Sequence, residues 1–295
     1  MLGGAEAIEG ETRMSDESWN PPVRPTLGRW LTGPWEGEEG TLVDVDVDGL
    51  LVRRPNGAEA TGHPEAFVSS SGDSGDSLLA AVLTPPSWKT LFRGGIREAL
   101  ASAWSTAKIG FGDTNAWERP MDYVVDDGMG NTGVAHFLLG GGVVAAICDH
   151  ESTRRFQPEE AIQRAPPDLR TPLAQVCSLP LLSGPHPISA VFWSEGDVLS
   201  GPEPWWRIYL QGARLFHSEL LPPSMWVTSG AAHHDLPETV VSLVQRIAAR
   251  AELGTPLLTL ARAELRGLVP PGAPHEDQAH DVLFAGGLLA LEGAP

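Results

Sequence analysis

The sequence predicts an α+β fold: a largely antiparallel sheet with one long helix, followed by a helical C-terminal part. Three observations indicate this class. Residues 42–54 alternate apolar and acidic side chains, as a half-buried strand does. Residues 87–106 place apolar side chains three and four positions apart, which is the spacing of a helix packed on a core. Residues 121–149 contain apolar runs joined by glycine turns, which is typical of antiparallel strands.

We expect three parts along the chain: an irregular N-terminal arm over residues 1–40, an α+β domain over 41–230, and a helical region over 231–295 packed on the same core. Prolines keep the arm extended, and its tryptophans are expected to hold it against the main body. Met14 is a second possible start for the chain.

The first element expected after the arm is an acidic hairpin. Its valines alternate with Asp44, Asp46 and Asp48, and Asp48-Gly49 is a tight-turn pair. This spacing also resembles the start of a calcium-binding loop, but the twelfth position holds Pro55 where such a loop needs a glutamate. We therefore interpret the three aspartates as an exposed face that could bind a partner.

The long helix is expected to begin after Pro85-Pro86, with Ser87 as its N-cap. The pair Gly94-Gly95 weakens the middle of this helix and permits either a kink or close packing. In the middle of the chain we expect a helix or loop over Pro158–Arg164. We also expect five strands: Met121–Val125, Thr132–Leu139, Val143–Cys148, Ile188–Trp193 and Trp206–Leu210.

The C-terminal region is expected to be helical. Asp235 and Glu238 have the spacing of a capping box, and the helix that follows is expected to end at Gly254. Further helices are expected over Leu257–Leu268 and Asp281–Leu291.

The composition restricts the class of partner. The chain holds 38 acidic and 20 basic residues, for a net charge of −18. Nucleic acids and anionic membranes need clustered Lys and Arg, so neither is expected to bind, whereas a basic protein would be attracted. The chain shows neither a signal-peptide pattern nor an apolar run long enough to span a membrane, and its two cysteines form no disulfide framework, so we expect a cytoplasmic protein. The small number of lysines is typical of a GC-rich bacterial genome.

The densest polar cluster is Cys148-Asp149-His150-Glu151-Ser152, at the expected end of a strand. Asp149, His150 and Glu151 could serve acid–base or metal chemistry, with Cys148 as a possible nucleophile. Adjacent residues on a strand point to opposite faces, so the four can converge only if the strand ends there. The alternative, which we favour, is that Asp149 and Ser152 cap a turn while His150 and Glu151 bond to the backbone.

Two other groups are candidates for function. His233-His234-Asp235 could be exposed loop residues or half of a metal site shared with His150. Trp205 and Trp206 could form a binding platform, although core packing is the more common role. A phosphate-binding loop and a dinucleotide fingerprint are absent from the sequence, and we expect no cofactor, no metal and no assigned catalytic residue.

The turn from Asp127 to Asn131 and the run from Asp149 to Ser152 resemble those of a group of bacterial proteins associated with toxin-immunity loci. Those proteins carry a similar Gly-Asn turn, a strand pair and a closing Asp-His-Glu-Ser. The resemblance covers 27 of 295 residues, from 126 to 152. It implies an antiparallel α+β fold and a binding role, and it assigns no catalytic residue.

Three hypotheses follow. The first is a non-enzymatic binding protein, an immunity-type inhibitor or accessory protein, whose acidic surface attracts a basic partner. The second is a hydrolase with its site near Asp149, His150 and Glu151, assisted by Cys148 or His234. The third is a structural component of a larger bacterial assembly, docked through exposed apolar patches.

Overall fold

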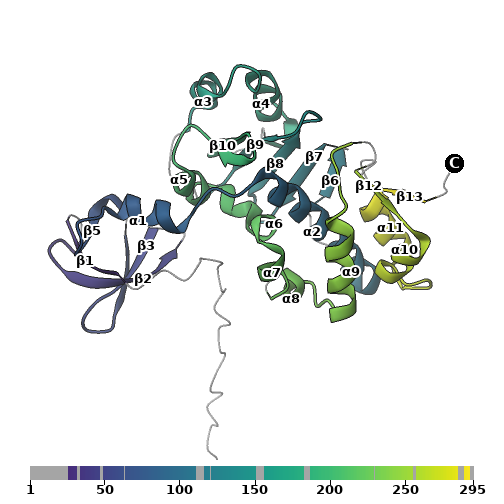
Figure 1. The fold of residues 1–295 in the computed structure, drawn as a ribbon, viewed down its shortest axis with the longest axis horizontal. Coiled ribbons are helices and arrows are strands. Elements are labelled where there is room, and N and C mark those ends of the chain that lie inside the picture. Colours follow the sequence, from purple (N-terminus) through teal and green to yellow (C-terminus); the bar gives the residue numbers. More distant parts are fainter. Residues whose placement is uncertain are drawn as a thin grey trace, which may run out of the picture.

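The computed structural model describes residues 26–31, 34–46, 49–62, 64–110, 116–119, 121–150, 156–182, 187–228, 230–254, 257–284 and 289–292. It has a mixed α+β fold with two antiparallel sheets, one long helix and a mainly helical C-terminal part, which confirms the predicted class (Figure 1). Within these residues, no helix is long and apolar enough to cross a membrane.

A small antiparallel sheet forms the N-terminal part, with strand order β4-β3-β2-β1-β5 (Figure 1). The predicted hairpin is present as β2 and β3. The core of the small sheet contains Trp30 and Phe67, whose ring centroids lie 5.2 Å apart in an edge-to-face arrangement. The elements are β1 (Thr26–Trp30), β2 (Glu39–Asp46), β3 (Gly49–Arg53), β4 (Glu59–Gly62), the 3₁₀ turn η1 (Pro64–Ala66), β5 (Phe67–Ser69) and α1 (Gly75–Val82).

The expectation of an irregular arm up to residue 40 is wrong for residues 26–30 and 39–40, which are strand. The cause is long-range pairing. Strand β1 lies between β2 and β5 and is hydrogen-bonded to both, and the local sequence of β1 does not indicate these partners. Trp30 is buried in this sheet, as expected of an anchoring tryptophan. Met14 lies outside the described residues.

The larger sheet is a six-stranded antiparallel sheet in the order β11-β10-β9-β8-β7-β6. The strands predicted within residues 121–148 and 188–193 are confirmed. Gly141 and Gly142 have φ values of 93° and 118°, and they form the tight turn between β8 and β9. The strands are β6 (Ala116–Arg119), β7 (Asp122–Asp126), β8 (Thr132–Phe137), β9 (Val143–Cys148), β10 (Ala190–Glu195) and β11 (Val198–Ser200).

The two faces of this sheet pack against different helices, because alternate residues of each strand point to opposite sides. One face, here called the α2 face, packs on the long helix α2 (Trp88–Ile109). The other, here called the outer face, packs on α3 (Pro158–Arg164), α4 (Arg170–Cys177) and the 3₁₀ turn η2 (Pro180–Leu182). On β7, Tyr123 belongs to the first face and Val124 to the second.

Helix α2 begins and packs as the sequence predicts. The Ser87 hydroxyl accepts a hydrogen bond from the Lys89 N–H at 3.2 Å, and Gly110 ends the helix with φ 75°. A Cβ atom at Gly94 would lie 1.9 Å from the carbonyl oxygen of Glu219. This glycine therefore allows the backbone of another segment to lie directly against the helix.

The C-terminal elements bury most of their apolar side chains in the same cluster as the α2 face (Figure 1), whereas Trp206 enters the core of the smaller sheet. They are α5 (Trp205–Leu210), the 3₁₀ turn η3 (Ala213–Phe216), α6 (His217–Leu220), α7 (Pro223–Trp226), α8 (Gly230–His233), α9 (Glu238–Ala248), β12 (Leu258–Leu260), α10 (Arg262–Leu268), α11 (Glu276–Phe284) and β13 (Leu289–Leu291).

Several local predictions in this part are wrong. Residues 206–210 are helical, since adjacent tryptophans enter two different cores. The segment 257–268, expected to be one helix, is instead strand β12 followed by α10, because β12 pairs in parallel with the distant β13. Strand β13 in turn occupies the end of the segment 281–291, which was also expected to be a helix. Asp235 is not the N-cap of α9: its φ is +49°, and the helix begins after Pro237.

Candidate functional site

The turn that joins β7 to β8 is held by side-chain bonds of Asp127. One oxygen of its carboxylate accepts hydrogen bonds from the N–H groups of Met129 (2.8 Å) and Asn131 (3.0 Å), and the other accepts one from the Asn131 amide (2.6 Å). Burial alone would raise the pKa of Asp127, but these hydrogen bonds outweigh it and lower the pKa. The carboxylate therefore stays ionised and stabilises the turn.

The predicted cluster at the end of β9 is bonded to this turn. The oxygen of the Asn131 side chain accepts hydrogen bonds from the backbone N–H of His150 (2.8 Å) and from its ring atom Nδ1 (2.6 Å). The buried Asp149 carboxylate forms an ion pair with Arg214 at 3.2 Å. Asp149 and His150 are thus bonded to the side chains of Arg214 and Asn131, and the interpretation that Asp149 and Ser152 cap a turn stays a prediction. Glu151 and Ser152 lie outside the described residues.

The two cysteines lie in the apolar layer between the outer face and α4. The Cys148 thiol donates to the carbonyl oxygen of Leu182 at 3.4 Å. Burial raises the pKa of Cys148. The pKa of Cys177 is raised to about 12, mainly by burial and also by the nearby Cys148 and Glu159. Both groups are therefore thiols at neutral pH, and neither is an activated nucleophile.

The paired tryptophans are core residues. Trp205 packs under the larger sheet, with its ring 5.6 Å from that of Phe192, and Trp206 enters the core of the smaller sheet. Both are buried, so they form no exposed platform. Arg207, next to them on α5, forms an ion pair with Glu65 of η1 at 2.7 Å.

The acidic hairpin is only partly described. Asp44 and Asp46 lie in β2, opposite Leu51 and Gly49 of β3. Asp48 lies outside the described residues.

A buried polar network that the sequence did not suggest lies where α2 meets the C-terminal helices. Glu98 of α2 accepts hydrogen bonds from the Trp226 ring N–H (2.5 Å), from His234 Nε2 (2.8 Å) and from the Ser218 hydroxyl. Burial would raise the pKa of Glu98, but the contacts with His234, Ser218 and Trp226 outweigh it and lower the pKa. Glu98 is therefore a buried carboxylate with a full set of donors.

A second glutamate lies beside this network. Glu219 is buried and accepts a hydrogen bond from the Tyr123 hydroxyl at 2.6 Å. Burial and the nearby charge of Glu98 raise its pKa to about 8, so it is mostly protonated at pH 7. Burial lowers the pKa of Arg97, while the two glutamates act against this; its guanidinium donates to the Leu221 carbonyl at 2.6 Å.

Glu98, His234 and Ser105 stand in the order of an acid–histidine–serine relay. Nδ1 of His234 lies 3.5 Å from the Ser105 hydroxyl, but that hydroxyl lies closer, at 3.2 Å, to the backbone carbonyl of His234, to which it donates. This arrangement anchors the loop before α9 to α2. Among the described residues, no group of three His, Cys, Asp or Glu side chains could hold a metal ion, and the hypothesis of a metal shared by His234 and His150 gains no support.

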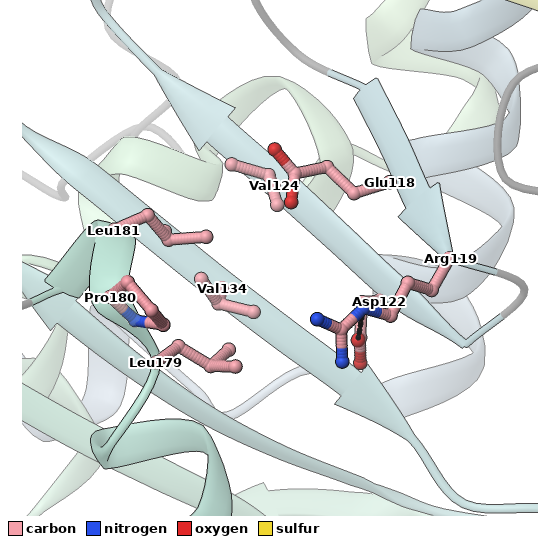
Figure 2. A pocket seen from close by; sticks show the side chains of 8 residues that line it. All are labelled: Glu118, Arg119, Asp122, Val124, Val134, Leu179, Pro180 and Leu181. Atoms are coloured by element: carbon pink, nitrogen blue, oxygen red, sulfur yellow. Dashed lines mark ion pairs between the residues drawn. The ribbon is translucent and has the colours of Figure 1, made fainter.

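A hollow of about 270 Å³ opens on the outer face, between β6 and the segment formed by Leu179 and η2 (Figure 2). Its residues come from three strands and that segment. Sequence reasoning missed all of them, because the hollow forms only where residues 179–181 meet strands that are distant in the chain. They are Glu118, Arg119, Asp122, Val124, Val134, Leu179, Pro180 and Leu181. The chain is thus an α+β protein with a mixed apolar and charged hollow on one sheet face.

Neither a family model, a curated protein nor a solved structure matches this chain.

Proposed function

We propose that this chain is a non-enzymatic bacterial binding protein of the cytoplasm, an immunity-type inhibitor or accessory protein, which binds a basic protein partner. The observation that carries the proposal is the surface charge. The chain has a net charge of −18, and many of its basic side chains are engaged within the chain by carboxylates. Such pairs are Arg53–Glu59, Arg54–Glu38, Lys89–Asp197, Arg207–Glu65, Arg214–Asp149 and Arg250–Glu264.

This pairing leaves acidic side chains in excess at the surface. Exposed examples on separate elements are Glu39, Glu118, Glu160 and Asp277. A surface of one sign attracts a protein of the other sign over several ångströms and speeds their encounter. It repels the phosphates of nucleic acids and anionic lipids.

The test is a pull-down of the tagged full chain from its native lysate at 20 and 500 mM salt. We expect a basic protein to be captured at low salt and lost at high salt, because the Debye length falls from about 20 to about 4 Å. With the purified partner, the association rate should fall at least tenfold between these salts. An association rate that does not depend on salt would contradict the proposal.

A hydrolase remains the alternative, and the order of Glu98, His234 and Ser105 is the observation that favours it. Its test is the reaction of the full chain with a fluorophosphonate probe, with Ser105→Ala as the control. Labelling that the variant abolishes would support the hydrolase and count against a purely binding role.

A further inference from the structure

The outer face of the larger sheet is covered over only part of its width. Helices α3 and α4 and the turn η2 pack on β8, β9 and β10. Over β6 and β7 the same face opens into the hollow described above (Figure 2). This is the part of the sheet where a partner can reach strand side chains.

A β-bulge gives the hollow its charged rim. The register between β6 and β7 shifts between Trp117 and Arg119. A bulge adds one residue to a strand and so alters the alternation of its side chains. Trp117 is buried on the α2 face, whereas both Glu118 and Arg119 line the hollow.

The hollow has an apolar half and a charged half (Figure 2). Val124 and Val134 form its floor, and Leu179 and Leu181 stand on one side. The charged residues stand on the other side. Such a site matches a side chain with a long apolar stem and a polar end.

The charged half contains two carboxylates and one guanidinium. Asp122 Oδ1 lies 2.5 Å from Nδ1 of His136, and its Oδ2 is 3.8 Å from Nε of Arg119. The Arg119 side chain is 68% exposed, so its ion pair contributes little. No described side chain pairs with Glu118. A second cation can therefore take the place of Arg119.

We propose that the hollow receives one Lys or Arg side chain of the basic protein partner, an inference that rests on the proposed function and names its contact surface. The stem lies over Val124 and Val134, and the cation bonds to Asp122 and Glu118, displacing Arg119. The volume of about 270 Å³ leaves room for one long side chain and lies at the lower edge of the range for small-molecule sites. A protein is the source that the net charge of −18 favours.

The first experiment needs no identified partner. The ¹⁵N-labelled full chain is titrated with acetyl-arginine amide and acetyl-lysine amide, with acetyl-glutamine amide as the uncharged control. We expect amide shifts at Val124, Val134 and Leu181 with the two cationic probes, at millimolar concentrations. Absence of these shifts at 20 mM probe would overturn the inference.

Substitutions then locate the cation. Asp122→Asn and the more exposed Glu118→Gln should each weaken probe binding about tenfold, which is the effect of one hydrogen bond to a charged group. Arg119→Ala should strengthen binding. The matched control is Glu160→Gln on α3, which removes the same charge outside the hollow and should change binding less than twofold. Equal weakening by Glu118→Gln and Glu160→Gln would contradict the site.

A further titration distinguishes a protein partner from a free amino acid as the source of the cation. Free arginine should bind no more tightly than acetyl-arginine amide; affinity a hundredfold higher would identify a small-molecule site and contradict a protein partner.

The pull-down separates this inference from the proposed function. If a basic partner is captured and its affinity is unchanged by Asp122→Asn, this inference is wrong but the proposed function stands. If the cationic probes bind but no basic partner is captured, the proposed function is wrong.

Discussion

The turn around Asp127 and the network around Glu98 are both clusters of hydrogen-bonded polar side chains, but they are built differently. Asp127 bonds to Asn131, 4 residues away, and Asn131 bonds to His150, 19 residues away. Glu98 bonds to residues 120 to 136 positions away and is buried. Asp127 is exposed, so water can replace its hydrogen bonds when they are lost, but water cannot enter the buried network. The network therefore fixes the tertiary structure, whereas the turn fixes only a local one.

The largest effect is expected from Glu98→Ala. This substitution leaves the donors of Trp226, Ser218 and His234 buried without their acceptor, which should lower the free energy of unfolding by about 3–5 kcal/mol. Urea denaturation measures it. The control Glu160→Ala, at an exposed site on α3, should change stability by less than about 0.5 kcal/mol. Similar effects of the two substitutions would remove the contrast between buried and exposed carboxylates.

Gly94→Ala should have the next largest effect on the free energy of unfolding. The added methyl group would lie 1.9 Å from a backbone oxygen of Glu219, so α2 and α6 must move apart, and we expect a loss of about 2–3 kcal/mol. Gly267→Ala in α10 is the control, since its methyl group meets only the tip of Leu243 at 2.7 Å. That control should lie between neutral and a gain of about 1 kcal/mol. A gain in melting temperature for Gly94→Ala would show that the two segments do not touch.

Glu219→Gln should change how stability depends on pH. The folded-state pKa of Glu219 is about 8, above its ordinary 4.5, so the folded protein holds this proton more tightly than the unfolded chain. The stability of the native protein should therefore fall as pH rises from about 4.5 to about 8 through this group. The neutral Gln removes that fall, so the unfolding free energy of Glu219→Gln relative to the native protein should rise by about 3 kcal/mol between pH 6 and pH 9. A relative free energy that does not rise would show that Glu219 is already ionised at pH 6.

The smallest effect is expected from Asp127→Ala. The turn loses its acceptors, but water reaches the freed N–H groups, so the loss should be about 1 kcal/mol. Hydrogen exchange at Met129 and Asn131 should become faster, while exchange in α2 should not change. A loss as large as that of Glu98→Ala would mean that the turn also supports the core.

The same contrast explains what could be predicted from the sequence. The turn from Asp127 to Asn131, the Ser87 cap and the strands within residues 121–148 follow from neighbours in the chain, and the structure confirms them. The pairing of β12 with β13 depends on a partner about 30 residues away, so residues 257–260 were mistaken for helix. Nothing near Glu98 in the sequence indicates that it is buried in a network, because its donors come from three distant segments.

The hollow on the outer face was hidden for another reason. Its charged residues lie at positions 118, 119 and 122 and form no known motif, and a bulge places both Glu118 and Arg119 at the hollow against the expected alternation. The sequence instead drew attention to the end of β9, where Asp149 and His150 are bonded to Arg214 and Asn131. A dense polar motif can thus be structural, while charged residues without a motif form the surface proposed for binding.

The proposed contact surface is tested most directly by comparing hydrogen exchange in the free chain and in its complex with the captured partner. We expect protection of Ala116–Val125, of β8 and of residues 179–182, with little change in the turn from Asp127 to Asn131 or around Glu98. Protection confined to the end of β9, with β6 and β7 unaffected, would contradict it and return the binding role to Asp149 and His150.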